Sequence, residues 1–171
     1  MTETKPTLTD DRLDGRRDFD FLAGRWHIAN QRLDDYLNPN SGAWLEFEST
    51  CESGPILGGL GNHDTYYAPD IPGRPEYHGF ALRLFDPEAR VWRIWWASTV
   101  AAGQLDTPVV GRFENGRGQF ECADVFDGRP IKVRFDWTEI TRSSARWEQS
   151  FSFDDGLSFA PNWIMLFERI S

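Results

Sequence analysis

The chain has 171 residues, of which 40% are apolar and 26% charged, so it suits one domain with a hydrophobic core. Its net charge of −9 disfavours nucleic acid and anionic membrane surfaces as partners, because both select basic patches. The sequence shows neither an apolar signal segment nor a run long enough to span a membrane. We therefore expect a cytoplasmic protein with no nucleic-acid or membrane partner.

The first residues are polar and include Pro6, which predicts a flexible N-terminus over residues 1–17. A short helical turn is expected within residues 11–22. The apolar residues Phe19, Phe21 and Leu22 then form a plug ahead of Gly24-Arg25-Trp26. We predict a single β-barrel domain over residues 18–171.

Short apolar-alternating runs separated by turn residues occupy the rest of the chain and predict about ten strands. They lie near 25–35, 43–52, 60–67, 77–85, 91–99, 107–113, 118–126, 129–139, 145–153 and 159–169. Consecutive antiparallel strands with one apolar face and no covering helix favour a closed sheet. The predicted fold is all-β, a single antiparallel up-and-down barrel with a short helical plug at its N-terminus.

Two strong hairpin turns predict the pairing of the strand at 118–126. Asn115-Gly116 and Asp127-Gly128 both favour type I′ turns. Each turn independently places Phe120, Cys122 and Asp124 on the apolar face. The opposite face then pairs Glu121 with Arg134, a favourable contact in solvent.

The turn over residues 86–90 predicts another hairpin if its register is symmetric. That register pairs inward-facing His78 with Ser98, Phe80 with Trp96, Leu82 with Ile94, and Leu84 with Trp92. The outer face would then carry Arg83, Arg93 and Trp95.

A turn over residues 141–144 predicts the next hairpin. It aligns Ile131, Val133, Phe135 and Trp137 with Phe153, Phe151, Gln149 and Trp147, which makes Gln149 the one polar residue on that face. The last strand is expected to turn Trp163, Met165 and Phe167 inward. A slip of one residue would bring Ile164 and Leu166 inward instead.

The Gly24-Arg25-Trp26 step before a meander of strands resembles the opening of lipocalins and fatty-acid-binding proteins. In that superfamily the tryptophan packs at the closed end of the barrel, and an arginine from a late strand often covers it. The resemblance implies this covering role for Arg169. The chain from residue 18 to 169 also resembles a bacterial family of uncharacterised lipocalin-like (calycin-type) domains. The matching segments are 19–26, 58–62, 84–87 with the Trp-rich strand after it, 126–131 and 146–149. This second resemblance implies a fold and no activity.

The sequence predicts no metal site and no cofactor. Strand alternation separates His27 from His78 and leaves the facing of His63 open, so the three histidines do not converge. Some haem-binding barrels of similar shape use a histidine near the chain end, and this chain has none there. Cys51 and Cys122 lie in apolar-patterned strands, which suits reduced thiols; one disulfide between them stays open.

The leading functional prediction is a barrel that binds a small, mostly apolar or amphipathic ligand in its interior. Polar residues on the apolar face, together with one tryptophan, define the predicted site, because an apolar pocket with a few convergent polar groups is the usual ligand site. The set is Asn30, Arg32, His78, Trp96, Ser98, Asp124 and Gln149. Asn30 and Arg32 belong to it only if Trp26 points inward, because side chains alternate along the strand. Arg32 is the most informative member because an unpaired buried guanidinium is costly. Asp124 or a carboxylate on the ligand could pair with it.

The sequence is also compatible with two other functions. A barrel enzyme of isomerase or cyclase type would use His78 as general base and Asp124 as its acid or orienting partner. A barrel filled by its own side chains would serve as a structural domain, with exposed aromatics such as Trp95 and Trp44 forming a homodimer. Interior volume separates the filled barrel from the other two, because ligand sites begin at about 300 Å³.

Overall fold

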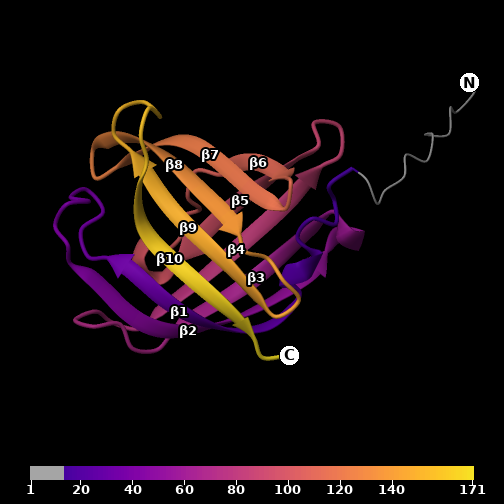
Figure 1. Cartoon of the computed structure of the whole chain (residues 1–171), viewed down its shortest axis with the longest axis horizontal. Helices are drawn as coiled ribbons and strands as arrows, with labels where there is room; N and C mark the ends of the chain where they lie inside the picture. The colour runs from indigo at the N-terminus through magenta and orange to yellow at the C-terminus, as the bar shows by residue number, and fades with distance from the viewer. Residues whose placement is uncertain (1–13) are drawn as a thin grey trace, which may run out of the picture.

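Ten antiparallel strands form one closed barrel in the computed structural model, which describes residues 14–171 (Figure 1). The strands are β1 (Gly24–Leu33), β2 (Trp44–Ile56), β3 (Gly61–Ala68), β4 (Tyr77–Asp86), β5 (Val91–Ser98), β6 (Val109–Glu114), β7 (Arg117–Phe126), β8 (Arg129–Thr138), β9 (Ser144–Ser152) and β10 (Ala160–Arg169). Three short 3-10 turns accompany them: η1 (Asp20–Leu22), η2 (Leu57–Gly59) and η3 (Thr99–Ala101). Each strand pairs with its sequence neighbours, and β1 pairs with β10 to close the ring. The predicted all-β barrel is confirmed.

The two type I′ turn signals give the predicted registers. Asn115 and Gly116 both have positive φ, as do Asp127 and Gly128, which is the conformation such turns need. Gly111 pairs with Phe120, and Glu121 with Arg134. The guanidinium of Arg134 lies 2.6 Å from the Glu121 carboxylate on the outer surface. These registers are confirmed.

The hairpin between β8 and β9 and the register of β10 are also as predicted. Val133 pairs with Phe151, Phe135 with Gln149, and Trp137 with Trp147. On β10 the side chains of Trp163, Met165 and Phe167 are buried, whereas Leu166 is exposed. The alternative slip of the last strand is therefore excluded.

The predicted register of β4 against β5 is wrong by one residue. Trp92 pairs with Phe85 rather than Leu84, and Ser98 pairs with Gly79 rather than His78. The loop holds four residues, 87–90, because Arg90 adopts a positive φ of 55° and Asp86 pairs directly with Val91. This shift reverses the facing of every β4 side chain. Arg83, expected outside, is 5% exposed inside the barrel.

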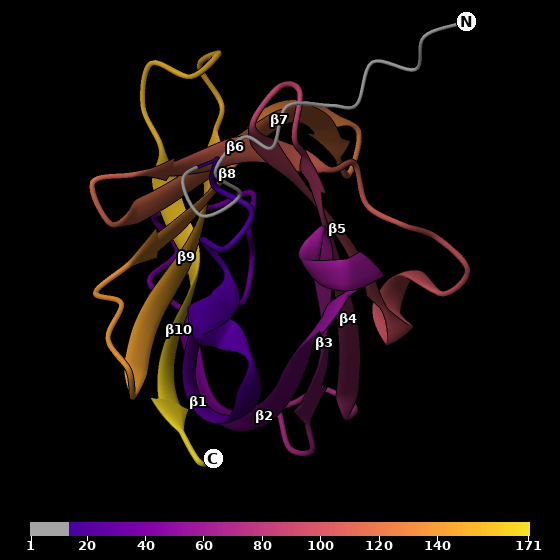
Figure 2. The same ribbon diagram turned by 90° about the vertical axis from the view of Figure 1, so that its right-hand side faces the viewer.

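The N-terminal turn packs against one end of the barrel. Phe19 is buried and its ring contacts Trp92, Phe113 and Phe120 at centroid distances of 5.0, 4.9 and 5.7 Å. Figure 2 shows this indigo segment within the ring of strands. Residues 1–13 of the predicted N-terminus lie outside the described residues, so the domain boundary at residue 17 stays a prediction.

The Gly-x-Trp step lies at the same end of the barrel. Trp26 is fully buried, and its indole nitrogen donates to the Leu22 carbonyl at 2.8 Å. The Arg169 guanidinium covers the ring of Trp26 at 4.1 Å, as the resemblance implied. Arg169 also donates to the carbonyls of Ala23 and Phe21, which ties the last strand to the turn. Trp26 therefore points inward, and Asn30 follows it into the interior.

Over residues 14–171, no helix is both long enough and apolar enough to cross a membrane.

Candidate ligand-binding cavity

The barrel encloses a cavity of about 430 Å³. This exceeds the roughly 300 Å³ at which ligand sites begin, so the interior is not filled by side chains. The cavity opens at the end opposite η1, between Tyr36 of the β1–β2 loop, the β5–β6 connection and the end of β7. Figure 2 shows the β5–β6 connection, residues 99–108, projecting away from the barrel wall. The floor of the cavity lies over the aromatic residues that surround Phe19.

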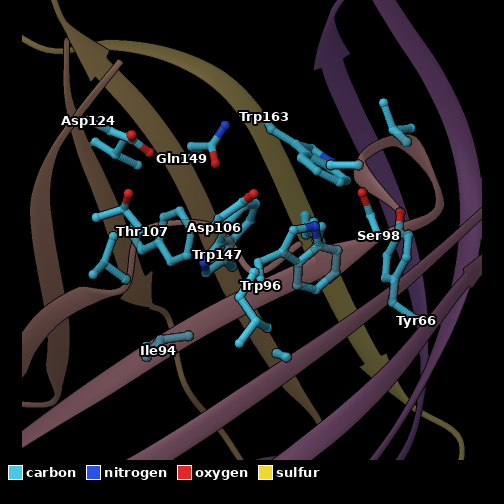
Figure 3. A pocket seen from close by; sticks show the side chains of 18 of the residues that line it. Tyr66, Ile94, Trp96, Ser98, Asp106, Thr107, Asp124, Trp147, Gln149 and Trp163 are labelled. Atoms are coloured by element: carbon cyan, nitrogen blue, oxygen red, sulfur yellow. The ribbon is translucent and has the colours of Figure 1, made fainter. Parts of the chain in front are cut away.

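Aromatic side chains form the middle of the cavity wall. Trp96 of β5, Trp147 of β9, Trp163 of β10 and Tyr66 of β3 all line it. Tyr66 and Trp163 meet edge to face at 6.0 Å, and Trp147 and Trp163 at 5.7 Å. In Figure 3, Trp96 and Trp163 lie between Tyr66 and Ser98 on one side and Asp124, Gln149 and Thr107 on the other. Such a wall favours apolar or planar ligands.

Polar groups hold these rings in place from behind. The Asn30 side-chain oxygen accepts from Tyr66 Oη at 2.8 Å and from Trp163 Nε1 at 3.0 Å. The Asn30 amide nitrogen donates to Ser49 Oγ at 2.8 Å. Trp96 Nε1 donates to Tyr77 Oη at 2.9 Å. Asn30 is 2% exposed and does not line the cavity, so it positions the wall rather than facing a ligand.

Arg32 lines the cavity within a cage of three rings. Its guanidinium carbon lies 4.7 Å from the Trp163 ring centroid, 5.1 Å from Tyr36 and 5.6 Å from Tyr77. Over the part of the chain that the structure describes, no carboxylate lies within 4.0 Å of it, so Asp124 does not pair with it. The Tyr36 hydroxyl beside it is buried and has no hydrogen-bond partner there either. Arg32 therefore presents an unneutralised positive charge to the cavity.

Two carboxylates lie at the mouth. Asp124 of β7 and Asp106 of the β5–β6 connection both line the cavity. The backbone N–H of Asp106 donates to the Trp96 carbonyl at 2.8 Å, which fixes the connection to β5. Partial burial, and then the charge of Asp124, raise the pKa of Asp106. The cavity therefore has a cationic side at Arg32 and an anionic side at its rim.

The remaining predicted residues divide between the interior and the outer face. Ser98 and Gln149 line the cavity, and the Gln149 side-chain amide donates to Asn162 at 2.9 Å. His78 does not face inward, because the register shift of β4 turns it outward. Its ring stacks on Tyr67 at 4.6 Å on the exposed surface.

The proposed acid–base pair is therefore not assembled. Asp124 lines the cavity, whereas His78 lies on the outside of the wall and its Nε2 is 3.7 Å from Glu76. Among residues 14–171, no group of three or more His, Cys, Asp or Glu side chains could hold a metal ion.

The charged and polar residues of the cavity that the sequence pattern did not reveal include Tyr36, Asp64, Arg83 and Asp106. Tyr36 and Asp106 come from connections, where no alternation reveals facing. Arg83 and Asp64 line the cavity from β4 and β3 and form an ion pair of 2.6 Å inside the barrel. The shifted β4 register concealed Arg83.

Both cysteines are free thiols, and both have a raised pKa. Cys51 is buried and lines the cavity, and burial raises its pKa. Partial burial, followed by the charges of Asp124 and Asp106, raises the pKa of Cys122 to about 11. The Cys122 thiol donates weakly to the Thr107 carbonyl at 3.8 Å.

Comparison with known proteins finds similarity at the level of structure. No family model matches the sequence, and no curated protein matches it either. Among solved structures, the chain is similar to the S-type phycobiliprotein lyase CPES from Guillardia theta, with a TM-score of 0.57 and 9% sequence identity. The match covers 97% of this chain and 99% of the lyase. At this identity the similarity supports the β-barrel fold alone.

Proposed function

We propose that this protein binds a small, mostly apolar ligand inside its barrel, and that the ligand carries an anionic group held by Arg32. The observation that carries the proposal is the guanidinium of Arg32, caged by three rings at a cavity of about 430 Å³ and lacking a carboxylate partner within the described chain. A partly desolvated guanidinium is stabilised by a charge-assisted, bidentate hydrogen bond to a carboxylate.

The surroundings of Arg32 favour a ligand of mixed character. Trp96, Trp147 and Trp163 offer apolar area beside the charge. The cavity volume suits a small molecule rather than a peptide. Val100, Leu105 and Val125 are exposed around the mouth, which gives an apolar ligand a favourable approach.

The test compares straight-chain carboxylates of about ten to sixteen carbons with primary alcohols of the same lengths, by displacement of a fluorescent probe. We expect the carboxylate to bind about tenfold more tightly than the alcohol, since a charge-assisted bond contributes about 1.5–3 kcal/mol. Arg32→Met should remove this preference while leaving alcohol binding unchanged.

Two further variants control the comparison. Arg32→Lys keeps the charge and should retain part of the preference. Arg25→Met removes an arginine that is exposed on the same strand, and should leave the preference intact. Equal affinity of the unmodified protein for the carboxylate and the alcohol would reject the proposal that the ligand carries an anionic group.

Location, assembly and origin remain proposals as well. A cytoplasmic location and membership of the bacterial family of lipocalin-like domains rest on the sequence alone. For the homodimer, the structure offers an outer face over β3–β5 on which Phe80 and Tyr67 are exposed and Leu82 and Trp95 half-buried. We propose this face, rather than Trp44, as the contact between two copies.

A further inference from the structure

The floor of the cavity carries a buried ion pair. Arg83 of β4 and Asp64 of β3 each expose 6% of the side chain, and Arg83 donates to Asp64 Oδ2 at 2.6 Å. A second guanidinium nitrogen donates to the Asn62 side-chain oxygen at 3.0 Å. Asn62 and Asp64 alternate on β3, so both acceptors come from one inward face.

This ion pair lies between the open cavity and the aromatic rings of the N-terminal turn and β8. The Arg83 guanidinium carbon is 5.1 Å from the Phe19 ring centroid and 5.9 Å from Trp137. Arg83 and Asp64 both line the same cavity as Arg32. Arg32 lies near the mouth and Arg83 over the N-terminal turn, so the cavity has a polar group at each end.

The Arg83 guanidinium retains unused donor capacity. A guanidinium carries more N–H groups than the two hydrogen bonds engage, and its Nε is buried without a partner among residues 14–171. Buried donors normally have partners. Well-packed apolar residues often stabilise a buried position as well as an ion pair does, so stability alone does not account for the pair.

We propose that Arg83 and Asp64 form a second polar subsite, which receives an uncharged hydrogen-bond acceptor at the inner end of the ligand. This inference rests on the proposed function, because Arg32 holds the anionic end. The inner group is a carbonyl or hydroxyl oxygen. Asp64 already neutralises Arg83 and repels a second carboxylate, and a plain alkyl end would leave the Arg83 donor unpartnered.

The test uses a second matched pair of probes. Straight-chain carboxylates of about ten to sixteen carbons are compared with the same chains bearing a methyl ketone at the far end. In the unmodified protein, the keto acid of the matching length should bind about tenfold more tightly than the plain acid. Shorter keto acids, which do not reach the floor, should show no preference.

A paired substitution tests the residues without leaving a lone buried charge. In Arg83→Met/Asp64→Leu the floor becomes apolar, so the preference for the keto acid should vanish while plain acids still bind. Circular dichroism and the retained affinity for plain acids report that the variant is folded. Persistence of the keto preference in this variant would overturn the assignment to Arg83 and Asp64.

The outcomes separate this inference from the proposed function. If plain and keto acids bind the unmodified protein equally at every length, an internal water satisfies Arg83 and only the subsite is rejected. If neither kind of acid binds at any length, the proposed function fails and the subsite fails with it.

Discussion

The indole nitrogen of Trp163 donates a hydrogen bond of 3.0 Å to the side-chain oxygen of Asn30, and this bond joins the last strand of the barrel to the first. Tyr66 donates to the same oxygen at 2.8 Å. One amide behind the wall therefore orients two of the rings that line the cavity, at the seam where β1 meets β10.

Replacing this amide should destabilise the barrel. In Asn30→Ala the Trp163 and Tyr66 donors both lose their acceptor in a buried site, so we expect a loss of about 3 kcal/mol in the free energy of unfolding. Urea denaturation followed by tryptophan fluorescence measures it. Gln31→Ala, at the exposed neighbouring position, should change stability by less than about 0.5 kcal/mol. Equal effects of the two substitutions would refute the role given to Asn30.

Gly79 keeps Trp96 in its place. A Cβ atom at residue 79 would lie 2.2 Å from the Trp96 ring. Gly79→Ala should therefore displace the ring, shift the tryptophan emission and cost about 1–3 kcal/mol. Gly54→Ala is the matched control, because a Cβ there meets nothing within 4 Å. An unshifted emission in Gly79→Ala would contradict the packing described for Trp96.

Cys122 should react slowly with thiol reagents at neutral pH. With its pKa raised to about 11, the thiolate fraction at pH 7 is about 100-fold below that of an ordinary cysteine, and the rate should rise about tenfold per pH unit up to that value. Cys51, which is buried, should react more slowly still. Stopped-flow measurement with a disulfide reagent between pH 7 and 10 tests this. A fast phase at pH 7 would contradict the raised pKa of Cys122, and with it the partial burial that is its main cause.

The Arg83–Asp64 ion pair should behave as a unit in stability measurements. Arg83→Met leaves a buried carboxylate unpaired and should cost about 3–5 kcal/mol. Adding Asp64→Leu should recover most of that loss, since an apolar pair replaces a buried ion pair with little cost. Thermal or urea unfolding of the single and double variants measures the coupling. Losses that simply add would mean that the two charges are solvated independently.

The outer face over β3–β5 is expected to mediate dimerisation. Leu82→Glu places a charge in the middle of this face and should convert a dimer to a monomer, with the fold unchanged. Leu166→Glu, at an exposed apolar position on β10, should leave the dimer intact. Sedimentation velocity distinguishes the two states. A monomeric unmodified protein would reject the homodimer altogether.

Most of the barrel could be predicted because its turns are explicit. Asn115-Gly116 and Asp127-Gly128 each specify a two-residue loop, so the loops determine the strand registers on either side. The Gly-x-Trp step likewise located Trp26, and with it the inward facing of Asn30.

The error in the predicted register of β4 against β5 has a physical cause. From Phe80 to Phe85 the strand is apolar on both faces apart from Arg83, so hydrophobic alternation could not identify the inner face. Register then depended on the loop, and the left-handed conformation of Arg90 shortened it to four residues. Arg83, which was expected on the outer face, therefore lines the cavity, and His78, which was expected on the inner face, lies on the outer face.

The side chains at the mouth of the cavity could not be placed from the apolar–polar alternation of the sequence. Asp106 lies in a connection whose backbone is fixed by one bond to Trp96, a contact that no local sequence signal records. The charge of Arg32 was predicted to need a partner, and the structure shows that its immediate partners are rings. Facing follows from strand periodicity, whereas the partner of a buried charge depends on the whole fold.

Native mass spectrometry of the purified protein tests the central claim of an interior ligand most directly. We predict a mass above that of the bare chain, and denaturation should release an anionic, mostly apolar small molecule that fits a cavity of about 430 Å³. Reloading the protein with a straight-chain carboxylate should restore the higher mass, and Arg32→Met should weaken that reloading. A bare-chain mass, together with unchanged tryptophan fluorescence across a panel of lipids and metabolites, would contradict the claim.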